Sequence, residues 1–197
     1  MKLLLASMFA LIGAWKVLSL HAGNYSLAAA TINVVNLATD TAKKPVFTLE
    51  ESTVTPFIIL TIRDTAATTA EISRVLGRDY GEIFAFIQQN GFRPGRMMAF
   101  YHSYQPTFIL EAAIEVDKLP GQLSGRVTAK EVTGGKAIIA RYKGPYEQVG
   151  IAYAGIYSRL KEQNKTADGP PFEVYLNDPL LVNDPFELRT DVYQLIK

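Results

Sequence analysis

The chain contains no cysteine. Disulfide bonds, thiolate nucleophiles, thiolate metal sites and cysteine-linked lipid anchors all need this residue, so all four are excluded. Histidine is almost as scarce, since His21 and His102 are the only two and lie far apart in the sequence. Histidine-based zinc sites use several such ligands together, so we expect no metal site and no other cofactor.

The sequence also lacks an excess of charge of either sign. There are 20 Lys and Arg against 19 Asp and Glu, the net charge is +1, and the longest basic run is Lys43-Lys44. Nucleic-acid-binding proteins generally carry a clustered basic face, so we expect no nucleic-acid partner. What the chain does have is a globular composition, with 48% hydrophobic residues in a length of 197. This is enough for one domain with a sizeable core and a short extension.

The first 22 residues have the pattern of a bacterial secretory signal peptide, with Lys2 before an apolar run over 3–14. Small residues at which such a segment is cleaved follow at Ala22, Ala28 and Ala30. An uncleaved membrane anchor over 3–20, interrupted by Lys16, is one alternative, and an amphipathic helix on a cytoplasmic protein is another. We therefore expect the domain outside the cytoplasm, exported or membrane-anchored, with membrane contact only through an uncleaved N-terminal segment.

Residues 23–54 are small, rich in Thr and Ala, and weakly periodic. This composition predicts a tether without regular structure between the leader and the folded part of the chain. The folded domain is then expected to cover residues 55–197.

An internal repeat is visible inside this domain. The stretches 79–101 and 153–175 align at a constant offset of 74 residues, in the same order of elements. The identical pairs are Gly81 and Gly155, Gln89 and Gln163, Asn90 and Asn164, Gly95 and Gly169, and Tyr101 and Tyr175. Such self-similarity predicts a duplication, with copies over about 55–117 and 130–197.

Each copy is expected to run strand, helix, strand, strand, because apolar residues recur at strand and helix spacing. The expected elements are 57–63, 70–89, 96–103 and 107–117 in the first copy, and 136–142, 146–163, 171–177 and 186–196 in the second. Two such modules predict an α+β fold. One largely antiparallel sheet would carry two helices, with a groove on the pseudo-twofold between the halves.

Motifs in the second copy resemble those of a known family. They are Gly144-Pro145-Tyr146, Gly169-Pro170-Pro171, Glu173-x-Tyr175, Asn177-Asp178-Pro179 and Glu187-Leu188-x-Thr190. This pattern resembles the GyrI-like small-molecule-binding domain, also known as the AraC-type bacterial effector-binding domain, over about 55–197. The resemblance implies a duplicated strand–helix–strand–strand fold. It also implies a ligand cleft on the pseudo-twofold, in which aromatic residues around one acidic residue suit cationic, lipophilic compounds.

Strand alternation points to the same site. Glu173 and Tyr175 share one face of their strand, and the offset of 74 places Ala99 and Tyr101 on the equivalent face of the first copy. Tyr101 and Tyr175 should therefore be pseudo-symmetric, and Glu173 should lie opposite Ala99. A carboxylate in a semi-apolar groove needs a partner. A ligand cation there would also gain about 0.5–2 kcal/mol from each tyrosine face. The alternatives are an exposed carboxylate and ordinary packing of the tyrosines.

Other candidate residues surround this group. Met97 is candidate ligand lining, and Tyr146 and Tyr157 on the second helix would close the cleft, with core packing as the alternative. His102 follows Tyr101 and should point to the opposite face, so it is left out of the site. A solvated face is the favoured interpretation for three acidic residues that alternate along one strand, Glu111, Glu115 and Asp117.

The function that these residues favour is a stand-alone module that binds a lipophilic small molecule, cations included, without catalysis. A hydrolase with Glu173 as general base is an alternative, but Ala99 supplies no second carboxylate and the only tryptophan, Trp15, lies in the leader. A gyrase-inhibitor type of protein-interaction module would need the cytoplasm. A transcription regulator is disfavoured because residues 1–54 show no helix-turn-helix and no basic face. Haem binding is disfavoured because His102 points away from the groove. The oligomeric state is left open.

Overall fold

The computed structural model describes residues 43–103 and 105–197. The first half of this part comprises β1 (Val46–Val54), β2 (Phe57–Ala66), α1 (Thr69–Asn90), β3 (Pro94–Tyr101) and β4 (Phe108–Val116). The second half comprises β5 (Thr128–Val132), β6 (Gly135–Lys143), the 3-10 turn η1 (Tyr146–Gln148), α2 (Gly150–Glu162), β7 (Phe172–Tyr175), the 3-10 turn η2 (Pro185–Glu187) and β8 (Arg189–Leu195).

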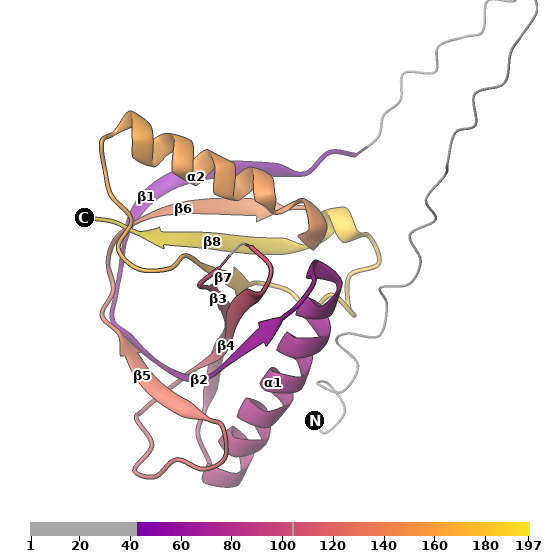
Figure 1. Cartoon of the computed structure of the whole chain (residues 1–197), viewed down its shortest axis with the longest axis vertical. Helices are drawn as coiled ribbons and strands as arrows, with labels where there is room; N and C mark the ends of the chain where they lie inside the picture. The colour runs from indigo at the N-terminus through magenta and orange to yellow at the C-terminus, as the bar shows by residue number, and fades with distance from the viewer. Residues whose placement is uncertain (1–42, 104) are drawn as a thin grey trace, which may run out of the picture.

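The strands form one antiparallel sheet in the order β1-β6-β8-β7-β3-β4-β2-β5. Helix α1 packs on β2, β3 and β4, whereas α2 packs on β6, β8 and β1 (Figure 1). The predicted α+β class, with an antiparallel sheet and two helices, is confirmed.

The strand order reads the same from either edge of the sheet. About the central β7–β3 pair, β8 and β6 on one side correspond to β4 and β2 on the other. The first strand of each half also pairs with a strand of the other half: β1 pairs with β6, and β5 pairs with β2. This is the pseudo-twofold order that two strand–helix–strand–strand copies would produce. The duplication itself stays an interpretation of the sequence.

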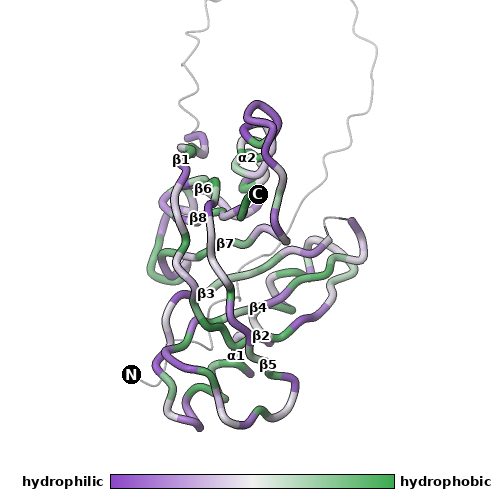
Figure 2. Tube along the Cα trace, turned by 90° about the vertical axis from the view of Figure 1, so that its left-hand side faces the viewer, coloured by the Kyte–Doolittle hydropathy of each residue, from purple (hydrophilic) through white to green (hydrophobic). Residues whose placement is uncertain are grey.

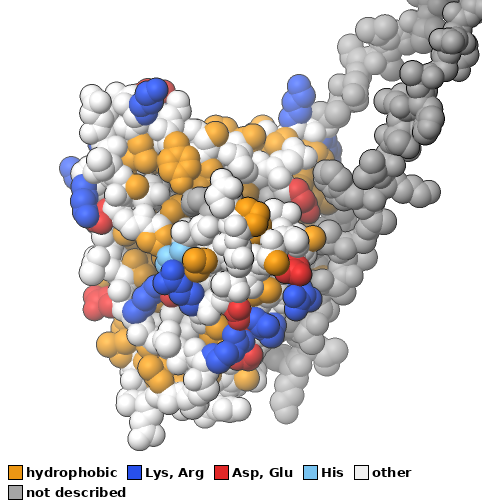
Figure 3. Space-filling view, in the orientation of Figure 1, with side chains coloured by type: hydrophobic (Ala, Val, Ile, Leu, Met, Phe, Trp, Pro, Cys, Tyr) orange, Lys and Arg blue, Asp and Glu red, His pale blue; other side chains and the backbone are white. Residues whose placement is uncertain are grey.

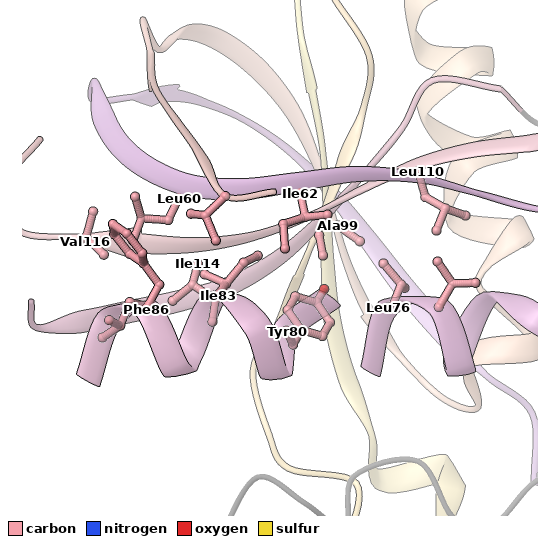
Figure 4. Packing of buried hydrophobic residues seen from close by; sticks show 14 of the residues in the cluster. Leu60, Ile62, Leu76, Tyr80, Ile83, Phe86, Ala99, Leu110, Ile114 and Val116 are labelled. Carbon is pink, nitrogen blue, oxygen red and sulfur yellow. The ribbon is translucent and has the colours of Figure 1, made fainter. Parts of the chain in front are cut away.

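Helix α1 forms because its apolar residues recur every three or four positions and face the sheet. Leu76, Tyr80, Ile83 and Ile87 are almost completely buried and pack against β2 and β4 (Figure 4). The helix ends at Gly91, whose φ of 68° lies in the left-handed region that favours glycine. Helix α2 buries a narrower stripe on the other half of the sheet, made by Ala152, Ile156 and Leu160.

The opposite face of the sheet carries a second core, to which neither helix contributes. Its centre is an aromatic row in which Phe172 stacks on Phe100 and on Tyr193, with ring centroids 4.9 Å apart in each pair. The central strands are therefore buried on both faces. Figure 2 shows the hydropathy of each residue along the strands, in a view turned by 90° from that of Figure 1.

The predicted boundary at residue 55 is too late. Residues 46–54, expected to end the tether, form β1 and pair with β6 from Val46 opposite Lys143 to Val54 opposite Gly135. The sequence signal was weak because only Phe47 and Leu49 are apolar and half-buried in the first part of this strand. Strand β5 was also not predicted.

The predicted signal peptide or anchor over 1–22 and the tether up to residue 42 lie outside the described residues. Within residues 43–103 and 105–197, no helix combines the length and apolar character that crossing a membrane requires.

Candidate functional site

Glu173 lies at the centre of the pseudo-twofold. In the β3–β7 pair it stands directly opposite Ala99, with Met97 opposite Tyr175 on the same face. Under the 74-residue offset, Ala99 and Glu173 exchange places, so the pseudo-twofold axis passes through this pair. The predicted asymmetry is therefore present: the carboxylate of one half meets the methyl group of the other.

Glu173 is 4% exposed, and tyrosine hydroxyls donate hydrogen bonds to its carboxylate. Tyr153 of α2 donates to Oε1 at 2.8 Å and Tyr175 of β7 donates to Oε2 at 2.9 Å, while Tyr101 also hydrogen-bonds to the carboxylate. Burial raises the pKa of Glu173, and these hydrogen bonds oppose the rise. Burial and the nearby Glu173 charge raise the pKa of Tyr101 and of Tyr175, so both are neutral donors.

The two helices place one tyrosine each over this pair. Tyr153 reaches Glu173 from α2, and Tyr80 points from α1 toward the sheet near Ala99 (Figure 4) and donates to the Met98 carbonyl at 2.8 Å. Sequence reasoning placed neither in the site. The buried positions of the helices correspond at an offset of 73, as in Ile83 with Ile156, so the 74-residue alignment hid the match between Tyr80 and Tyr153.

Tyr146 closes the site from η1. Its ring packs edge-on against Tyr175, with centroids 5.6 Å apart. Burial, then the charge of Glu173, raises the pKa of Tyr146 to about 12. The pKa of the neighbouring Tyr142 is raised to about 12 by burial as well, and its hydroxyl donates to the Pro145 carbonyl at 2.7 Å. An aromatic layer thus covers the carboxylate on the helix side of the sheet.

The structure brings together most of the residues that the sequence selected. Glu173, Tyr175, Tyr101 and Tyr146 cluster as expected, and the half-buried Met97 lies beside Tyr175. Tyr157 is not part of the cluster, because its side chain lies on the outer surface of α2 and the residue is 44% exposed. Two shallow hollows of about 200 and 250 Å³ lie at the ends of β6 and β8, and Glu173 lines neither.

His102 lies on the helix-free face, where its Nε2 is 2.8 Å from Oε2 of Glu111. The expectation of a solvated Glu111 is wrong, since this residue is 4% exposed. Its carboxylate also accepts hydrogen bonds from Thr61 and Lys130. The negative charge of Glu111 is therefore buried in the curled sheet and neutralised there by Lys130. Basic side chains gather beside the histidine in Figure 3.

The family model of the GyrI-like small molecule binding domain matches residues 48–197. The chain belongs to this family. The resemblance inferred from the motifs of the second copy is therefore confirmed, and residues 48–197 form a GyrI-like small-molecule-binding domain. A search of curated proteins finds no match to the chain.

Solved structures share the fold of this GyrI-like domain. The C-terminal domain of EcmrR superposes with a TM-score of 0.63 at 15% identity, covering 77% of this chain and 98% of that one. EcmrR in a complex with DNA gives a TM-score of 0.69 at 15% identity over 77% of this chain, which spans only 57% of that longer protein. SAV2435 bound to tetraphenylphosphonium gives a TM-score of 0.52 at 15% identity, covering 76% and 94% of the two chains.

Proposed function

We propose that this GyrI-like domain binds a lipophilic, positively charged small molecule at the junction of its halves, with Glu173 as the counter-ion. The observation that carries the proposal is that Glu173 is buried without a basic partner. Among residues 43–103 and 105–197, no Lys or Arg side chain forms an ion pair with it, and tyrosine hydroxyls donate its hydrogen bonds. A buried carboxylate of this kind is costly unless a positive charge joins it.

The other buried carboxylates of the central strands show the contrast. Glu111 pairs with Lys130 at 2.7 Å, and Asp191 pairs with Arg141. Both lie on the helix-free face, and the fold itself supplies their positive partners. Glu173 lies on the helix side, where the fold supplies hydroxyl groups and aromatic faces instead. This difference supports a role for Glu173 in holding a cation that comes from outside the chain.

The surroundings of Glu173 also suit a lipophilic ligand. Tyr101, Tyr146, Tyr153 and Tyr175 are each partly buried, so their rings offer apolar faces on which a cation gains about 0.5–2 kcal/mol per ring. Because Glu173 is only 4% exposed, a ligand must displace covering side chains. Tyr153 and Tyr146 are the candidates, since both come from the α2 region and not from the sheet. SAV2435, which has the same fold, is bound to the lipophilic cation tetraphenylphosphonium.

The test is a thermal-shift titration of the full chain with tetraphenylphosphonium. A cation at about 100 times its Kd should stabilise the wild type by about 2.7 kcal/mol and raise its melting temperature. Glu173→Gln should abolish the shift, because the neutral amide cannot serve as counter-ion. Glu162→Gln is the matched control, since this carboxylate is on α2 with its side chain 64% exposed. An undiminished shift in Glu173→Gln would remove Glu173 from the site.

A further inference from the structure

Two buried hydroxyl groups close to Glu173 have no hydrogen-bond partner among the described residues. They are the hydroxyl of Tyr146 and Oγ1 of Thr190, which is fully buried on β8. Native proteins pair nearly all their buried polar groups, because an unpaired one has lost its water without compensation. Such groups therefore indicate where a polar atom from outside the chain is received.

Both hydroxyls lie on the Tyr175 side of the carboxylate. Thr190 stands directly opposite Tyr175 in the β7–β8 pair and opposite Tyr142 in the β6–β8 pair. Tyr146 packs its ring against the ring of the same Tyr175, 5.6 Å away. Tyr175 in turn donates to Glu173 at 2.9 Å. The two unpaired groups and the carboxylate are thus arranged around one tyrosine.

The carboxylate itself keeps room for one more donor. Its two oxygens offer about four lone-pair sites, and three tyrosines, Tyr101, Tyr153 and Tyr175, already hydrogen-bond to them. A Tyr or Thr hydroxyl can also accept a hydrogen bond. The site therefore offers three acceptors to an incoming ligand: Glu173, Tyr146 and Thr190.

We infer that the site selects cations that carry N–H groups, namely protonated amines, over permanent cations without N–H such as quaternary ammonium or phosphonium ions. This inference rests on the proposed function. Aromatic faces attract both kinds of cation and do not discriminate between them. A permanent cation presents only C–H groups and leaves the hydroxyls of Tyr146 and Thr190 unpaired. An ammonium N–H pairs with Glu173 or with one of these hydroxyls.

The test compares two cations that differ in a single substituent, benzyldimethylammonium, which has one N–H, and benzyltrimethylammonium, which has none. Calorimetric titration of the full chain near neutral pH should show about tenfold tighter binding of the first, the effect of one satisfied hydrogen bond. At least one of Tyr146→Phe and Thr190→Val should reduce this preference by weakening only the amine, since a single N–H pairs with one acceptor at a time. Tyr157→Phe, which removes an exposed hydroxyl on α2, should preserve it.

Melting of the unliganded variants gives a second measurement. Tyr146→Phe and Thr190→Val should leave the melting temperature unchanged or raise it, because each removes an unpaired buried group. Clearly lower melting temperatures in both would show that the hydroxyls are already satisfied and would overturn the inference. Equal binding of the two cations, weakened for both by Glu173→Gln, would also overturn it but would leave the proposed function intact. Failure of both cations to bind would contradict the two together.

Discussion

The chemistry of the buried carboxylates differs with the residues that surround each one. Hydrogen bonds from Lys130, Thr61 and His102 lower the pKa of Glu111 although its burial alone would raise it. Glu173 receives hydrogen bonds from neutral hydroxyls, and burial prevails, so its pKa is raised. The two carboxylates, each 4% exposed, should therefore influence folding with opposite dependence on pH.

Glu173→Gln should become more stabilising, relative to the wild type, as the pH rises. The folded-state pKa of Glu173 lies above its usual value of 4.5, so the native state binds this proton more tightly than the unfolded state. The resulting stability is fully present below about pH 4.5 and is lost as the pH rises through the raised pKa, by about 1.4 kcal/mol for each pH unit between the two values. Urea unfolding of both proteins at several pH values measures the difference.

Glu111→Gln is the control with the opposite sign. The pKa of Glu111 is lowered in the folded state, so its ionised carboxylate stabilises the fold above the unfolded-state pKa of 4.5. This stabilisation is lost as the pH falls through the folded-state pKa. The wild type should therefore lose stability relative to this variant in acid. A stability difference between wild type and Glu173→Gln that did not change with pH would contradict the assignment of a raised pKa to Glu173.

At the residue scale, strand alternation predicted the arrangement of the residues around Glu173, whereas the choice of Glu173 as a ligand-binding residue came from the family resemblance and stays a prediction. Alternation placed Glu173 opposite Ala99 and put Tyr101 and Tyr175 on one face, since side chains alternate strictly along a strand. It did not find Tyr80 or Tyr153. Side chains do not alternate in this way along a helix. The strands of the two halves correspond at an offset of 74 residues and the helices at 73, and the sequence alone does not reveal this difference of one residue.

At the element scale, Gly81 of α1 and Gly155 of α2, which the 74-residue alignment pairs, lie in different surroundings. A Cβ at Gly81 of α1 would meet nothing within 4 Å, whereas a Cβ at Gly155 of α2 would lie 2.4 Å from Cε2 of Phe47. Phe47 belongs to β1, the first-half strand that pairs with β6 of the second half. Gly155 therefore allows α2 to pack closely against β1.

Gly81→Ala and Gly155→Ala should consequently change stability in opposite directions. Alanine stabilises an exposed helix position by about 0.5–1 kcal/mol relative to glycine, and Gly81→Ala should gain this amount. In Gly155→Ala the Phe47 ring must move, and overpacking of this kind costs about 1–3 kcal/mol, more than the helix gains. Chemical denaturation of both variants measures the two values. Equal stabilisation by both would show that Phe47 yields without loss of packing.

The elements that the sequence predicted are those whose own residues carry the signal. Apolar periodicity identified both helices and six of the strands, with ends that differ from the observed ones by a few residues. Strands β1 and β5 were missed because their pairing depends on partners far along the chain. In β5, only Val132 is buried and Ala129 is partly buried, which is too few residues to give an alternating pattern.

At the scale of the whole molecule, the halves are joined by more than the central β3–β7 pair. Each half completes its sheet with a strand from the other, so the connection from β1 to β2 and that from β5 to β6 both cross between the halves. The crossing points touch, because a Cβ at Gly134 would lie 2.2 Å from the carbonyl oxygen of Val54 and 2.9 Å from the carbonyl carbon of Thr55. The two crossing connections are therefore in direct backbone contact at Gly134.

Gly134→Ala should therefore destabilise the entire fold. Its φ of 69° costs a non-glycine residue about 1–3 kcal/mol, and the backbone atoms of Val54 and Thr55 cannot move aside as a side chain can. Gly125→Ala is the matched control, because Gly125 has a similar φ of 65° but nothing within 4 Å of its added Cβ. The free energy of unfolding of Gly125→Ala should fall only by the cost of the backbone conformation, and that of Gly134→Ala should fall clearly more. Denaturant unfolding measures both values, and each variant should unfold in one cooperative transition. Equal losses in the two variants would show that the connection at Val54 and Thr55 accommodates the added Cβ without cost, and would contradict the prediction.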